Sequence, residues 1–119
     1  MSILRKLQKY NNKQFHYEGV FITRIDIRTK ALQEPTNGVR GVATVTFGNS
    51  FAVRNISIVE SKAGNLFISM PSYKMKTTDE NGKPQFKDIA YPVSKDFREK
   101  LQENVLHSYD IGEDVTFEI

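Results

Sequence analysis

The sequence predicts an α+β fold, in which an antiparallel sheet of about five strands is followed by one amphipathic helix near the C-terminus. Three observations lead to this prediction. Segments in which apolar and polar residues alternate occupy residues 20–92 and are separated by turn motifs rich in Gly, Asn and Pro. One segment with helical periodicity follows at residues 95–109. The length of 119 residues and the hydrophobic content of 39% suit a single domain with one core.

The first two strands are predicted from an alternating segment and the turn that follows it. In residues 20–30 the apolar side chains fall on one face of a strand and the charged side chains fall on the other. The Asn37-Gly38 pair is typical of a hairpin turn because both residues readily adopt positive φ angles. Residues 39–47 are rich in β-branched side chains and form the predicted second strand.

A second hairpin signal, Gly-Asn-Ser at residues 48–50, precedes a third predicted strand at residues 51–60. The apolar alternation slips by one residue within this strand. The slip predicts a β-bulge at Arg54 and Asn55.

Two prolines end the next predicted strands, because proline cannot donate a hydrogen bond to a sheet. Residues 66–70 are predicted to form a short strand that ends at Pro71. Residues 72–84 are polar and basic, and their pattern leaves open either a long loop or an extended hairpin tip. Residues 85–91 form one more short predicted strand, closed by Pro92.

The helix is predicted from apolar side chains that recur every four residues over residues 95–109. Ser94 is a suitable N-cap, and Gly112 is a suitable end signal. Residues 115–119 are compatible with an edge strand or with a tail. Four side chains from this part of the chain are assigned to the core: Phe67, Ile89, Phe97 and Leu101.

These patterns divide the chain into a basic N-terminal extension (1–19), a folded domain (20–112) and an acidic C-terminal tail or edge strand (113–119). Residues 2–10 have apolar side chains at helical spacing, namely Ile3, Leu4 and Leu7. A helix this short is marginal in water, so it docks on the domain, binds a partner or stays unattached.

The charges are unevenly distributed along the chain. The net charge is +3, from 17 Lys and Arg and 14 Asp and Glu. Residues 1–30 carry seven basic and two acidic side chains, whereas residues 101–119 carry five acidic side chains and no Lys or Arg. This gradient favours a surface that meets polyanions, with an acidic end that competes for it.

The composition argues against an enzyme and against a membrane protein. The chain has no Cys, which excludes disulfides, zinc fingers and thiol nucleophiles. Its two histidines, His16 and His107, lie 91 positions apart without a catalytic constellation around them. We expect no catalytic residue, no metal, no cofactor and no small-molecule substrate. A hydrolase built on the C-terminal carboxylates is the weakest alternative. With no segment long enough to span a membrane and no signal peptide, we expect a cytoplasmic protein.

The best candidate site is a cluster of cations interleaved with aromatic side chains in residues 73–87. Lysines supply phosphate contacts, and aromatic rings supply surfaces for base stacking. Arg40 and Arg54, on predicted strands, extend the same basic surface, together with Arg24 and Arg28. The predicted nucleic-acid-binding residues are Lys74, Lys76, Lys83, Lys87, Arg54, Arg40 and Tyr73.

Three ordered motifs give the chain a family resemblance. They are GNLFISMPS at residues 64–72, FKDIAYP at residues 86–92 and VLHSY at residues 105–109. In this order and spacing they resemble the SpoVG family of septation and sporulation proteins. The resemblance implies an antiparallel sheet with a C-terminal helix. It also implies a non-enzymatic, cytoplasmic homodimer that pairs sheet edges and binds DNA, and in some members RNA, to regulate bacterial gene expression.

The family's basic residues carry over only in part. The basic pair that follows Met-Pro-Ser falls on Tyr73 and Lys74, so one charge is lost, and Lys76 is in position to replace it. The family arginine of the second motif corresponds to Lys87, and its histidine corresponds to Tyr91. The alternative function is a protein-interaction module, in which a sheet edge or the Ile3-Leu4-Leu7 segment binds a partner protein.

Overall fold

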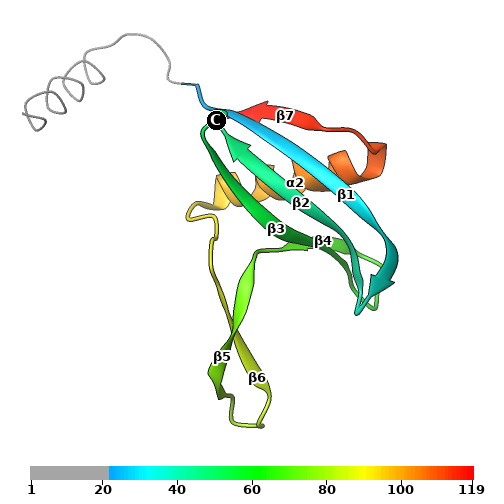
Figure 1. The fold of residues 1–119 in the computed structure, drawn as a ribbon, viewed down its shortest axis with the longest axis vertical. Coiled ribbons are helices and arrows are strands. Elements are labelled where there is room, and N and C mark those ends of the chain that lie inside the picture. Colours follow the sequence, from blue (N-terminus) through cyan, green and yellow to red (C-terminus); the bar gives the residue numbers. More distant parts are fainter. Residues whose placement is uncertain (1–21) are drawn as a thin grey trace, which may run out of the picture.

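The computed structural model describes residues 22–119, which form two sheets and one helix (Figure 1). The strands of the main sheet are β1 (Arg24–Thr36), β2 (Val39–Phe47), β3 (Phe51–Glu60), β4 (Leu66–Ser69) and β7 (Val115–Glu118). All neighbouring pairs in it are antiparallel, in the order β4-β3-β2-β1-β7. The helix α2 (Lys95–Ile111) covers one face. The α+β prediction is confirmed, whereas the extension 1–19 with Ile3, Leu4 and Leu7 lies outside the described residues.

Local turn signals account for the first hairpins. Asn37 and Gly38 have φ angles of 54° and 81° and connect β1 to β2, as predicted. The bounds of β2 and β3 agree with the predicted segments. β1 continues to Thr36, beyond its predicted end at residue 30, because Thr36 pairs with Val39 across the turn.

The predicted bulge in β3 is confirmed. Ala43 pairs with Ile56 and Val45 pairs with Val53, so one residue of β2 faces two residues of β3. Asn55, in the bulge, has a φ angle of 63°. Such a left-handed conformation is uncommon outside glycine, but Asn tolerates it better than most residues.

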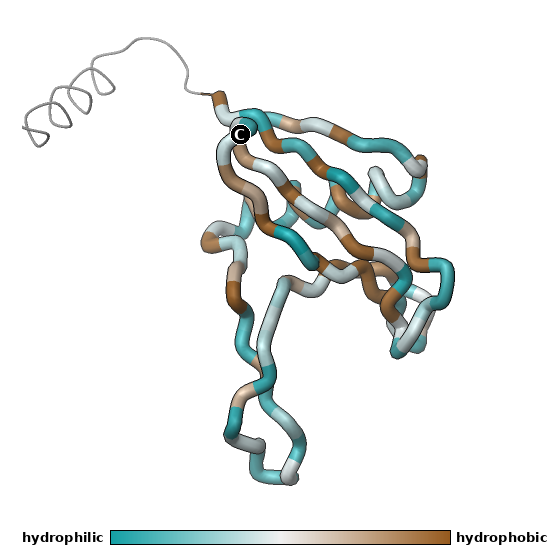
Figure 2. The backbone as a smooth tube through the Cα atoms, in the orientation of Figure 1, coloured by the Kyte–Doolittle hydropathy of each residue, from teal (hydrophilic) through white to brown (hydrophobic). Residues whose placement is uncertain are grey.

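The core lies between the sheet and α2. Ser94 caps the helix by accepting a hydrogen bond from the N–H of Phe97, and Gly112 ends it with a φ angle of 71°, as predicted. The buried apolar side chains alternate along three strands and recur on one side of α2; they are Ile25, Ile27, Ala43, Val45, Ile56, Ile58, Leu101 and Val105. Figure 2 shows this alternation as brown and teal bands along the main strands.

Residues 72–88 form an arm that projects from the main sheet (Figure 1). The arm is a two-stranded sheet of β5 (Ser72–Thr78) and β6 (Pro84–Asp88). The structure therefore selects the extended hairpin over the loop. The C-terminal residues, for which a strand and a tail were both open, form the edge strand β7 beside β1.

Two of the four core assignments are wrong. Leu101 is buried and Phe97 packs against the core, but Phe67 and Ile89 are 39% and 67% exposed. The apolar run at the start of β4 does not show which residues face inward, and it is Ile68 that packs against the core. Ile89 follows β6 and lies at the base of the arm, outside the main sheet, where its N–H donates to the carbonyl of Pro71.

Candidate nucleic-acid interface

The arm is held in shape by its turn and by its base. One carboxylate oxygen of Asp79 accepts hydrogen bonds from the N–H groups of Asn81 and Lys83, each at 2.9 Å. At the base, the N–H of Ile89 donates to the carbonyl of Pro71 at 2.7 Å. These bonds hold both ends of the ribbon in place. Figure 2 shows that the ribbon is largely hydrophilic along its length.

The predicted lysines surround the arm and do not gather on one side of it. Tyr73 pairs with Lys87, and Lys74 pairs with Phe86. Because cross-strand partners share a face and successive residues alternate, each face of the ribbon carries one lysine and one aromatic ring. Tyr73 and Phe86 are 49% and 65% exposed.

The remaining two lysines extend the charge toward the tip. Lys76 follows Lys74 by two residues on β5, and Lys83 directly precedes β6. Within residues 22–119, no Asp or Glu lies within ion-pair distance of any of the four lysines. Their charges are therefore available to an external anion.

Arg40 and Arg54, which sequence reasoning added to the same basic surface, lie on the main sheet. Arg40 donates to one Glu60 oxygen through both Nε and Nη2, at 2.9 and 2.6 Å. Arg40 therefore already has an acidic partner within the chain. Arg54 lies in the bulge of β3 and lines a hollow on the sheet face opposite α2. The structure thus separates the seven candidates into an arm group of five and two sheet residues.

Comparison of the sequence with those of known proteins identifies the family of this chain. The sequence model of the SpoVG family matches residues 22–111, which is most of the chain. The chain belongs to the SpoVG family. Its relatives include proteins named "Putative septation protein SpoVG" from Thermoanaerobacter sp. strain X514, with 42% identity over 85 residues, and from Clostridium beijerinckii, with 40% identity over 89 residues. These alignments cover 71% and 75% of this chain and 84% and 87% of the relatives.

The SpoVG motifs occupy the arm, its base and the buried side of α2. The first motif forms β4 and enters β5, and the second forms most of β6 and the segment after it. In the third motif, Val105 and Ser108 are buried, and the ring of Tyr109 lies against Gly41. Much of the SpoVG signature therefore specifies how the arm and the helix attach to the sheet.

Other site chemistry has little support in this SpoVG domain. Among residues 22–119, no group of three or more His, Asp or Glu side chains is placed to hold a metal ion. In the same range, no helix is long and apolar enough to cross a membrane. The sequence did not point to the threonines on the exposed face of the sheet, which are Thr44, Thr46 and Thr116. The available signal was the alternation of Thr44 and Thr46 with Val45 in β2.

Proposed function

We propose that this SpoVG protein is a non-enzymatic, cytoplasmic regulator of gene expression that binds DNA through the arm. The single observation that carries the proposal is a projecting two-stranded ribbon with an exposed aromatic ring on each face and four exposed lysines, none of which pairs with an acidic side chain among residues 22–119. The names of the relatives link them to septation, and we extend that role to this chain.

The shape of the arm favours duplex DNA as the target. The major groove of B-DNA admits a two-stranded β-ribbon, whereas the deep, narrow major groove of A-form RNA excludes side chains. A ribbon in a groove has a phosphate strand on each side of it. Lysines on both faces, such as Lys74 and Lys87, suit that position better than they suit a flat binding surface.

The side chains of the arm predict that nucleic-acid affinity depends strongly on salt concentration and weakly on the base sequence. Lysine ammonium groups contact phosphates as point charges and lack the bidentate geometry of arginine. The rings of Tyr73 and Phe86 add stacking surfaces that accept any base. Because stacking on these rings needs unpaired bases, single-stranded DNA and RNA are the second class of ligand in this proposal, after duplex DNA.

We also propose that two copies associate by pairing main-sheet edges along β4. β4 has only four residues and ends the sheet, so one side of its backbone has no strand from residues 22–119 beside it. Open edges of this kind are prone to pair with another strand. The exposed side chain of Phe67 on β4 adds apolar surface beside that edge.

The test is fluorescence anisotropy of labelled random duplex DNA, single-stranded DNA and RNA with the full chain. A double variant, Lys74→Glu with Lys76→Glu, is expected to lose duplex binding without unfolding, because both side chains are exposed. The matched control is Lys62→Glu with Lys100→Glu, which makes the same charge change at exposed positions outside the arm.

Retained affinity in the arm variant contradicts the arm assignment. Equal loss in both variants indicates that only net charge matters. If the wild-type chain binds none of the three polymers, the protein-interaction module becomes the better hypothesis, with Phe67, Ile89 and the open edge of β4 as its contact surface.

A further inference from the structure

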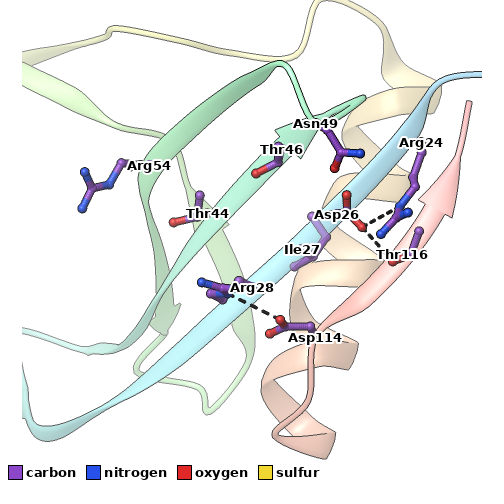
Figure 3. A pocket seen from close by; sticks show the side chains of 10 residues that line it. All are labelled: Arg24, Asp26, Ile27, Arg28, Thr44, Thr46, Asn49, Arg54, Asp114 and Thr116. Carbon is purple, nitrogen blue, oxygen red and sulfur yellow. Dashed lines mark hydrogen bonds and ion pairs between the residues drawn. The ribbon is translucent and has the colours of Figure 1, made fainter.

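The main sheet carries a second polar feature, on the face opposite α2, which we call the outer face. A hollow of about 710 Å³ lies there, lined by residues from β1, β2, β3 and β7 (Figure 3). Three arginines and two aspartates line it, together with the hydroxyl groups of three threonines. None of these side chains belongs to the arm.

Four of the lining residues follow one another across the sheet. Arg28 pairs with Thr44 in the register of β1 and β2, and Thr44 faces the bulge that contains Arg54. Asp114 lies on the other side of Arg28, as Figure 3 shows. Since neighbouring strands are about 4.8 Å apart, the backbones at Arg28 and Arg54 are separated by roughly 10 Å, with a hydroxyl between them.

Arg54 reaches this row by the ordinary alternation of β3, directly after the inward-facing Val53, and the bulge restores the inward direction at Ile56. Val53 and Ile56 on either side of it pair in register with inward-facing residues of β2. The extra residue between them is accommodated by the left-handed conformation of Asn55. Arg54 and Asn55 therefore both lie opposite Thr44, and bulges are common next to functional sites.

The three arginines differ in how firmly they are already paired. Arg24 donates to Asp26 at 2.9 Å, and the same oxygen of Asp26 accepts from the hydroxyl of Thr116. Arg28 reaches Asp114 only at 3.4 Å, and both side chains are largely exposed.

Arg54 has no acidic partner in the part of the chain that the structure describes. An exposed ion pair as long as that of Arg28 contributes little stability, so it exchanges readily for a better anion. Arg28 and Arg54 are therefore the two arginines available to a ligand.

We propose that the outer face binds a phosphate group over Thr44, between the guanidinium groups of Arg28 and Arg54, and that Asp114 competes for Arg28. Guanidinium groups bind phosphate oxygens bidentately, and the threonine hydroxyl donates a further hydrogen bond. The phosphate belongs either to a nucleic-acid backbone or to a free polyphosphate, since both present the same oxygens. This site is separate from the arm and does not depend on arm binding.

The experiment is an NMR titration of the full chain with inorganic triphosphate and, separately, with a short single-stranded oligonucleotide. Saturable shifts are expected at Thr44 and at the side-chain Nε–H groups of Arg28 and Arg54. Arg54→Gln is expected to weaken binding about tenfold, because it removes one charge-assisted interaction. Lys30→Gln is the matched control, since Lys30 is an exposed cation on β1 that does not line the hollow.

A second pair of variants tests the competition. Asp114→Asn is expected to tighten triphosphate binding severalfold by releasing Arg28, whereas Glu113→Gln makes the same charge change one residue away and leaves binding nearly unchanged. An equal effect of both variants contradicts specific competition by Asp114.

The outcomes separate this site from the arm. Absence of saturable shifts on the outer face, in a chain that binds DNA through its arm, overturns the phosphate site and leaves the proposed function intact. Shifts that persist in the Lys74→Glu, Lys76→Glu variant support the outer-face site even if the arm binds nothing. Binding of triphosphate alone identifies a free polyphosphate as the ligand, and binding of both identifies the shared phosphate chemistry.

Discussion

At the scale of single residues, the hydroxyl of Ser108 connects the helix to the sheet. Its side chain is fully buried on α2, donates to the carbonyl of Glu113 at 2.6 Å and lies 2.8 Å from the hydroxyl of Thr29 on β1. A buried polar group costs free energy unless it is hydrogen-bonded. Here the Ser108 hydroxyl is hydrogen-bonded to both the Thr29 hydroxyl and the Glu113 carbonyl, where the chain turns from α2 into β7.

We expect Ser108→Ala to lower the free energy of unfolding by about 1–3 kcal/mol, because it leaves the partly buried oxygens of Thr29 and Glu113 without their partner. Adding Thr29→Val removes one of those unpaired groups, so the double variant is expected to lose less than the sum of the two single losses. Urea denaturation of the wild type, both single variants and the double variant measures this coupling. Strict additivity would show that the hydrogen bond between the two hydroxyls contributes nothing.

At the scale of elements, the arm is an appendage of a fold whose core is complete without it. None of the fully buried core residues lies in residues 72–88. Ser72 and Asp88 are register partners at the base, so a two-residue turn is sufficient to join them.

Replacing residues 73–87 with Asn-Gly is expected to leave the thermal midpoint nearly unchanged and to abolish DNA binding. Circular dichroism melting checks the fold, and anisotropy with duplex DNA checks the function. Full DNA affinity in the shortened chain would transfer the proposed function to the main sheet. A large drop in the melting midpoint would show that the arm also supports the fold.

The features of the fold that the sequence predicts are those that depend on short local patterns. Turns such as Asn37-Gly38 and caps such as Ser94 depend on a few adjacent residues, so their local patterns are sufficient. The bulge at Asn55 is likewise visible as a slip in alternation. The exposure of Phe67 and Ile89 depends on which strand lies beside β4 and on where the arm leaves the sheet, and alternation carries no information about either.

The candidate site was predicted in part for the same reason. The lysines of the arm are neighbours in sequence, so their clustering is visible in the chain. Their division between two faces depends on the pairing of Tyr73 with Lys87, which requires the register of the hairpin. The row of Arg28, Thr44 and Arg54 combines residues from three strands, and only the sheet brings them together.

At the scale of the whole molecule, the charge distribution determines how binding responds to salt. If about five lysines and arginines of a bound dimer contact phosphates, the logarithm of the binding constant is expected to fall with the logarithm of salt concentration with a slope of about −4 to −5. Anisotropy at several concentrations between about 50 and 200 mM salt measures this slope on duplex DNA.

The variant Lys76→Gln is expected to flatten that slope by about 1 for each copy of the arm that contacts DNA. Lys62→Gln, outside the arm, is expected to leave the slope unchanged. A wild-type slope near zero would show that phosphate contacts do not drive binding.

The assembly itself provides the last prediction. If two copies pair along β4, the mass in solution is expected to be twice the 13.7 kDa of one chain. Phe67→Lys adds a charge beside this edge, where natural sheets use lysine to prevent pairing, and is expected to give a monomer. Thr116→Lys makes a similar change on β7, the opposite edge of the sheet, and is expected to leave the dimer intact. Sedimentation equilibrium distinguishes these cases. Dissociation by Thr116→Lys alone would move the interface to β7, and a monomeric wild-type chain would leave each arm to bind DNA on its own.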